Sequence, residues 1–232
     1  MTCHSFSLAH HLETLNLFKD SGYHIGPVSD YFNKKIYDKH ILLRHDIDLS
    51  LDYALDMALL EKDNDIQSTY YILLHSDLYN AASPEGIERI RAIKAAGHDI
   101  GLHIDTRHFL GPIEFEILAQ IAQCNITSWC RHLVNVTPTL DIAYDASTIP
   151  YKYVSDSAMR YREGCFCNHV NKHDKLQILR HPEWVMVDPT GKLDKYQIMQ
   201  RLEEEAKGRT AKSFLDFRDL VRTTGELIAS VV

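Results

Sequence analysis

The stretch Ile41–Asp48, which reads Ile-Leu-Leu-Arg-His-Asp-Ile-Asp, constrains the fold of this chain more than any other. Three apolar residues run directly into charged ones without a turn residue, which is typical of a buried strand in a parallel sheet. Asp46 and Asp48 should point to the same side of that strand, because side chains repeat every second residue. Two carboxylates on one face repel each other, and a divalent cation is the usual way to neutralise them. The alternative is a strand that ends in a solvated acidic turn.

Helical and strand-like patterns alternate along the rest of the chain. Helices are predicted over 7–20, 51–62, 83–96, 112–124 and from 193 onward, and further strands over 68–74, 98–103, 128–131, 151–155 and 176–180. This alternation indicates parallel βα units and therefore an α/β fold. We expect one domain over residues 1–232, because no linker-like stretch divides the chain. Residues 1–40 should form an N-terminal helix and a lead-in that is irregular over 23–40, and residues 193–232 should form C-terminal helices.

Composition narrows the class of protein. Hydrophobic residues at 45% and charged residues at 25% are ordinary for a globular protein, and the net charge of −7 argues against a nucleic-acid partner. No apolar stretch approaches the length of a membrane span. The N-terminus lacks the pattern of a secretory signal, and the five cysteines are an odd number, so we expect a cytoplasmic protein with reduced thiols. These features leave the oligomeric state open.

A second signal lies in Gly97–His108. His103 falls at the predicted carboxyl end of its strand, level with Asp48 at the end of another. An imidazole and a carboxylate at neighbouring strand ends can begin a site for zinc or another transition metal. His108 could reach back from the following loop as a third ligand. Any one of these histidines alone would more often be a packed or solvated residue.

Three motifs together resemble the polysaccharide deacetylase (NodB-homology) superfamily: His45–Asp48, Gly97–His103 and Ile178–Pro182. The resemblance covers roughly residues 41–184 and is greatest to the branch with an Arg-His-Asp-x-Asp first motif, which is linked to surface-glycan and O-antigen synthesis. It implies a distorted, incomplete (β/α) barrel with a groove at the carboxyl ends of the strands. It also implies an enzyme that uses one divalent metal ion, zinc or another transition metal, to remove an acetyl or related acyl group from an N-acylated sugar or glycan precursor.

The resemblance assigns roles to individual residues. It implies Asp46 as the general base, His181 as the general acid, and Asp48 and His103 as metal ligands. Amide hydrolysis needs such groups, because a water must lose a proton, the leaving amine must gain one, and the developing oxyanion must be stabilised. The candidate substrate-binding residues are Arg131, His132, Asp156 and Trp184.

The chain departs from the family at one metal position. The second metal histidine of the family lies four residues after the first, where this chain has Arg107. The expected third ligand is therefore His108, one residue further on, with His132 or a water as alternatives. The departure also favours a rival hypothesis, a catalytically inactive member of the fold that binds a sugar or nucleotide-sugar. A second rival is a scaffolding partner in a biosynthetic complex.

A third cluster contains Cys165, Cys167, His169 and His173. Two thiols and two imidazoles within nine residues could hold a structural zinc ion. The alternative is a loop over the groove in which both cysteines are reduced and not joined by a disulfide.

Overall fold

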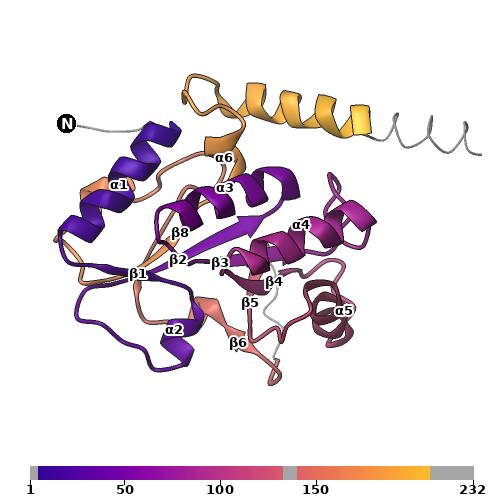
Figure 1. Cartoon of the computed structure of the whole chain (residues 1–232), viewed down its shortest axis with the longest axis horizontal. Coiled ribbons are helices and arrows are strands. Elements are labelled where there is room, and N and C mark those ends of the chain that lie inside the picture. The colour runs from indigo at the N-terminus through magenta and orange to yellow at the C-terminus, as the bar shows by residue number, and fades with distance from the viewer. Residues whose placement is uncertain (1–4, 133–139, 210–232) are drawn as a thin grey trace, which may run out of the picture.

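The computed structural model describes residues 5–132 and 140–209, and its strands and helices alternate along the chain (Figure 1). The strands are β1 (His24–Gly26), β2 (His40–Ile47), β3 (Thr69–Leu73), β4 (Asp99–Asp105), β5 (Ser128–His132), β6 (Tyr144–Asp145), β7 (Lys152–Ser155) and β8 (Lys175–Leu179). The helices are α1 (Leu8–Asp20), α2 (Ser29–Phe32), α3 (Leu51–Asp63), α4 (Pro84–Ala95), α5 (Ile113–Ala122), α6 (Glu183–Met186) and a helix over 195–209, with short 3₁₀ turns η1 (Ala146–Thr148) and η2 (Phe166–His169).

All strand pairings are parallel, in the order β6-β5-β4-β3-β2-β8-β7. Strand β2 lies near the middle: β8 pairs along one edge, while β1 and then β3 pair in succession along the other. In the described part of the chain, β6 and β7 do not pair with each other, so the sheet does not close. The α/β class and the incomplete (β/α) barrel are therefore confirmed.

Both faces of β2 are buried, which explains its continuous apolar sequence. Ile41 and Leu43 pack in one cluster with Phe18 of α1. Leu42 points to the opposite face and packs in another cluster with Tyr71 of β3. Because side chains alternate along a strand, Asp46 lies on the same face as Leu42. This is the face of the sheet on which the candidate site lies.

The predicted helix starts are confirmed by their caps. The hydroxyl groups of Ser7, Ser50 and Ser83 accept hydrogen bonds from backbone N–H groups in the first turns of α1, α3 and α4. The segment 23–40, predicted as irregular, instead contains β1 and α2. Both elements are too short to show periodicity in the sequence, which is why the pattern missed them.

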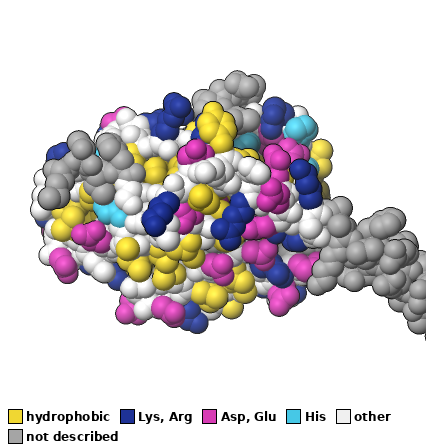
Figure 2. All heavy atoms as spheres, turned by 90° about the horizontal axis from the view of Figure 1, so that it is seen from above, with side chains coloured by type: hydrophobic (Ala, Val, Ile, Leu, Met, Phe, Trp, Pro, Cys, Tyr) yellow, Lys and Arg dark blue, Asp and Glu magenta, His cyan; other side chains and the backbone are white. Residues whose placement is uncertain are grey.

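The predicted C-terminal helices are described only in part, because residues 210–232 lie outside the described residues. None of the helices that the structure describes combines the length and the apolar character needed to cross a bilayer. On the face seen in Figure 2, acidic, basic and apolar side chains are interspersed.

Candidate functional site

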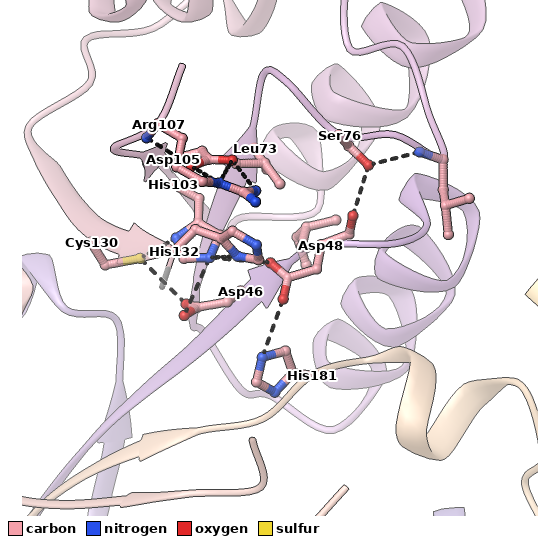
Figure 3. A network of polar contacts seen from close by, with 12 residues as sticks. Asp46, Asp48, Leu73, Ser76, His103, Asp105, Arg107, Cys130, His132 and His181 are labelled. Atoms are coloured by element: carbon pink, nitrogen blue, oxygen red, sulfur yellow. Dashed lines mark hydrogen bonds and ion pairs between the residues drawn. The ribbon is translucent and has the colours of Figure 1, made fainter. Parts of the chain in front are cut away.

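The carboxyl ends of four parallel strands bring charged side chains together (Figure 3). Strand β2 supplies Asp46 and, one residue beyond its end, Asp48. The other side chains of this group come from β4, β5 and the residues after β8: His103, Cys130, His132 and His181.

Three potential ligand atoms converge at the centre. Asp48 Oδ1 lies 3.1 Å from His103 Nε2 and 3.2 Å from His132 Nδ1, and these two nitrogens lie 3.2 Å apart. Asp48 Oδ1 is buried but accepts no hydrogen bond of normal geometry from the residues that the structure describes. Two imidazole nitrogens thus face one buried carboxylate oxygen, Asp48 Oδ1, at the centre of the group.

This arrangement fits a divalent transition metal ion. Nitrogen and oxygen ligands about 2.0–2.1 Å from a tetrahedral zinc ion lie about 3.3 Å from one another, close to the observed separations. Imidazole and carboxylate are also the ligand types that zinc accepts. The structure places Asp48 and His103, both predicted as ligands, in this group and adds His132.

The predicted third ligand, His108, lies outside the group. Its side chain is 61% exposed, and its Nδ1 lies 3.2 Å from Asp105 Oδ2. Arg107, which stands at the family's histidine position, also turns to Asp105, with 2.6 Å between Arg107 Nη2 and Asp105 Oδ2. Asp105 therefore holds both side chains of the loop after β4, so the structure does not bring His108 to Asp48 and His103.

Cys130 is a site residue that the sequence analysis missed. Its Sγ lies 3.0 Å from His103 Nδ1 and 3.5 Å from Asp46 Oδ1. The thiol therefore contacts the ring nitrogen of His103 that does not face Asp48. The period of two in Ser128–His132 could have indicated it, because Cys130 and His132 share one face of β5.

Asp46 is buried and paired with Arg44 on the same strand. The guanidinium donates two hydrogen bonds, Nε to Oδ1 at 3.1 Å and Nη2 to Oδ2 at 2.6 Å. Burial alone would raise the pKa of Asp46, but the charge and hydrogen bonds of Arg44, together with the charges of His103 and His181, outweigh burial and the pKa is lowered. Asp46 is therefore an ionised carboxylate 3.8 Å from His103 Nε2.

His181 is positioned by Asp156, which follows β7. The Nδ1 atom of His181 lies 2.7 Å from Asp156 Oδ1, and its backbone N–H donates to the same carboxylate. Burial would lower the pKa of His181, but the hydrogen bond and charge of Asp156, together with the charges of Asp48 and Glu183, raise it to about 10. The Nε2 atom lies 3.6 Å from Asp48 Oδ2, so a protonated imidazole borders the candidate metal ligands.

His45 and Arg180 support this segment from the other face of the sheet. His45 Nδ1 donates to the backbone carbonyl of Arg180 at 2.9 Å, and its Nε2 lies 2.8 Å from Glu61 Oε1 on α3. Arg180 is buried and donates to Asp156 at 3.3 Å. His45 therefore ties β2 and α3 to the backbone beside His181.

The four predicted substrate-binding residues differ in how buried they are and in what they contact. Asp156 is fully buried against His181 and Arg180, and Trp184 is buried in an apolar cluster with Val187 and Ile198. Arg131 is partly exposed and donates to Ser147 Oγ at 2.9 Å. His132 lies among the candidate metal ligands, as described above.

Glu183, a second residue that the sequence analysis missed, is buried on α6. Burial raises the pKa of Glu183 to about 8, against the opposing effect of His181. A cavity of about 600 Å³ lies away from these residues, between α5 and the segment 141–144 before and at β6. The chemistry of the site and this cavity thus occupy different places.

No protein-family model and no curated protein matches this sequence. Solved structures do resemble it. A pseudoenzyme of the CE4 family from Bacillus anthracis is 14% identical, with a TM-score of 0.44 and coverage of 72% of this chain and 62% of that one. This chain therefore spans less than two thirds of that protein's length.

Two deacetylases are similar to the same degree. The peptidoglycan deacetylase PdaC from Bacillus subtilis is 17% identical, with a TM-score of 0.44 and coverage of 76% of this chain and 96% of that one. The deacetylase PplD from Streptococcus pyogenes, solved in complex with acetate, is 14% identical, with a TM-score of 0.42 and coverage of 81% and 83%. The structures similar to this chain thus include both deacetylases and a pseudoenzyme.

Proposed function

We propose that this protein is a metal-dependent hydrolase that removes an acetyl or related acyl group from an N-acylated sugar or glycan precursor. We also propose that it belongs to the deacetylase branch whose first motif is Arg-His-Asp-x-Asp. The observation that carries the proposal is the convergence of Asp48, His103 and His132 between an ionised Asp46 and a protonated His181. This set would supply a metal site, a base and an acid within one group of strand ends.

The proposed metal ligands are Asp48, His103 and His132, with His132 in place of His108. Zinc is the first candidate because of the nitrogen and oxygen ligands and their spacing, and another transition metal is the alternative. When bound, the ion would polarise the acyl carbonyl and make a nearby water more acidic. Cys130 would orient the ring of His103, as outer groups commonly do for metal-binding histidines.

Asp46 and His181 would carry the proton transfers. Asp46 would accept a proton from the attacking water, and Arg44 keeps this carboxylate ionised and fixed. His181 would donate a proton from Nε2 to the leaving amine, because its Nδ1 is bound to Asp156. In this scheme Asp156 is a positioning residue, and Arg131 is the candidate that remains near the surface for substrate contact.

A second candidate function is sugar or nucleotide-sugar binding without catalysis. The pairing of Asp46 with Arg44 favours it, because two hydrogen bonds from a guanidinium weaken a carboxylate as a base. Arg107 at the family's histidine position favours it as well.

A screen for acetate release from N-acetylated sugars and nucleotide-sugars would test the proposal. The zinc-loaded protein should release acetate from at least one compound, and chelator treatment should abolish the release. A zinc-loaded protein that binds one of these compounds tightly and hydrolyses none would support the binding function instead.

A further inference from the structure

A second cluster of metal-binding side chains lies on the opposite face of the sheet from the candidate active site, between α1 and the loop after β7. His10 Nε2 lies 3.1 Å from Cys165 Sγ, and the sulfurs of Cys165 and Cys167 lie 3.3 Å apart. The three residues are separated by up to 157 positions in sequence, so only the fold brings them together. We propose that His10, Cys165 and Cys167 form a structural site for a thiophilic divalent ion, with zinc as the first candidate.

The ligand types favour zinc over a harder ion. Thiolate and imidazole are the ligands of structural zinc sites, whereas magnesium and calcium take oxygen ligands. Zinc–sulfur bonds of about 2.3 Å place two sulfurs on a tetrahedral ion about 3.8 Å apart. The sulfurs of Cys165 and Cys167 would therefore need to separate by only a few tenths of an ångström on binding.

The carboxylate of Glu13 next to His10 favours a cation in this cluster. His10 Nδ1 lies 3.4 Å from Glu13 Oε2, so a carboxylate faces the ring nitrogen that does not point to the sulfurs. This is the outer arrangement commonly found at zinc-binding histidines. Cys165 is fully buried.

The sequence pattern alone suggested different partners for the two cysteines. His169 instead turns its Nε2 to the backbone carbonyl of Glu163 at 3.1 Å, and its ring stacks on that of His173. The left-handed Gly164, at φ +85°, precedes Cys165 and allows the turn that directs this loop to α1. Of the described residues, His10 is therefore the imidazole that joins the two thiols.

Metal binding would clamp the loop after β7 to α1. That loop begins at Asp156, which holds His181 in the candidate active site. Binding of one divalent ion would release two thiol protons, and the two thiolates would neutralise its charge. The site therefore has a stabilising role that does not depend on the proposed deacetylase function.

Metal analysis and cobalt spectroscopy of the full-length protein would test this site. The wild-type protein should bind two zinc ions per chain, of which Cys167→Ser removes one and Asp48→Asn removes the other. Cobalt-loaded wild-type and Asp48→Asn proteins should both show thiolate-to-cobalt charge-transfer absorption in the near ultraviolet, and Cys167→Ser should lack it. Cys124→Ser is the matched control, since Cys124 belongs to neither cluster, and it should keep both ions.

Cys167 is the better site for substitution because it is partly exposed, whereas Cys165→Ser changes a fully buried residue. His10→Asn provides an independent variant and should weaken zinc binding by on the order of 10–100-fold or more. Charge-transfer absorption that persists undiminished in Cys167→Ser would overturn the proposal. A Cys165–Cys167 disulfide in freshly purified protein would overturn it as well. A wild-type protein that binds only the ion removed by Cys167→Ser, and no Asp48-dependent ion, would count against the proposed function and leave this second site standing.

Discussion

At the scale of single residues, Asp48 determines the charge balance of the candidate active site. Burial would raise its pKa, but His103 and His132 hold the pKa of Asp48 well below its usual range. The anionic oxygen is thus kept between two imidazoles, which can bind either protons or a metal ion. Two protonated imidazoles whose nitrogens lie 3.2 Å apart would repel each other. A single divalent ion would therefore balance the charge of Asp48 better than two protons on these rings would.

The first prediction separates the two candidate third ligands. His132→Ala should lower zinc affinity at the Asp48 site by on the order of 100-fold or more, because it removes a ligand atom. His108→Ala is the matched control and should leave zinc affinity unchanged, since its exposed ring contacts Asp105. Competition titration with a chromogenic chelator measures both. The assignment fails if His108→Ala loses the ion and His132→Ala retains it.

The second prediction concerns the pH dependence of hydrolysis. Asp156 contributes most to raising the pKa of His181 to about 10, against the effect of burial, so His181 stays protonated until the pH rises through that value. Asp156→Asn should move the basic limb of kcat/KM to lower pH by about 1–3 units. His181→Ala should lower turnover by on the order of 10²–10⁴-fold.

Asp63→Asn, an exposed carboxylate at the far end of α3, should leave the pH profile unchanged. A basic limb that does not move in Asp156→Asn would show that His181 is not the acid.

At the scale of elements, the register between β4 and β5 determines which imidazole lies beside Asp48 and His103. His103 pairs with Cys130 and Asp105 pairs with His132, so β5 brings a thiol and an imidazole beside His103. The sequence predicted the strand ends, and with them Asp46, Asp48, His103 and His181. It favoured His108 over His132, because the register of two strands is set by tertiary packing and cannot be inferred from local pattern.

The third prediction tests the close packing of β3 and β4. A side chain at Gly101 would overlap the Tyr71 ring, and the Arg44 guanidinium lies 5.1 Å from the centre of that ring. Gly101→Ala should lower the free energy of unfolding by about 1–3 kcal/mol, as overpacking usually does. Gly208→Ala is the control, because nothing lies near its added methyl group and alanine favours a helix. Urea denaturation that shows equal stability for both variants would contradict this packing.

The fourth prediction concerns the buried Glu61 of α3, which accepts hydrogen bonds from Ser68 and Tyr70 and pairs with His45. Burial would raise the pKa of Glu61, but His45, with smaller contributions from His98 and His11, outweighs burial and lowers the pKa from 4.5 to about 2. Because the folded pKa is depressed, the stabilisation is complete above pH 4.5 and is lost as the pH falls toward 2. Glu61→Gln should therefore cost about 3 kcal/mol at pH 7.

The difference in unfolding free energy between wild type and Glu61→Gln should shrink as the pH falls below 4.5. Glu88→Gln, at a side chain that is 80% exposed, should stay within about 0.5 kcal/mol of wild type throughout. Denaturant titrations at several pH values give both quantities. A gap that is constant with pH would mean that Glu61 is not ionised in the folded protein.

At the scale of the whole molecule, parallel topology explains why distant motifs form one site. Every strand presents its carboxyl end at the same edge, so residues from 46 to 181 meet there. The alternation of patterns was enough to predict this architecture. The contact between His10 and the two cysteines was not predictable, because it depends on how α1 packs against a loop about 155 residues away.

The central claim of the proposed function is that an ion held by Asp48, His103 and His132 is required for deacylation. The most direct measurement is acetate release from the best N-acetylated substrate, recorded while zinc is titrated into chelator-treated protein and bound metal is counted. Turnover should rise in proportion to occupancy of the Asp48-dependent site and should be absent in Asp48→Asn at every zinc concentration. Full turnover in metal-free protein, or in Asp48→Asn, would contradict the claim.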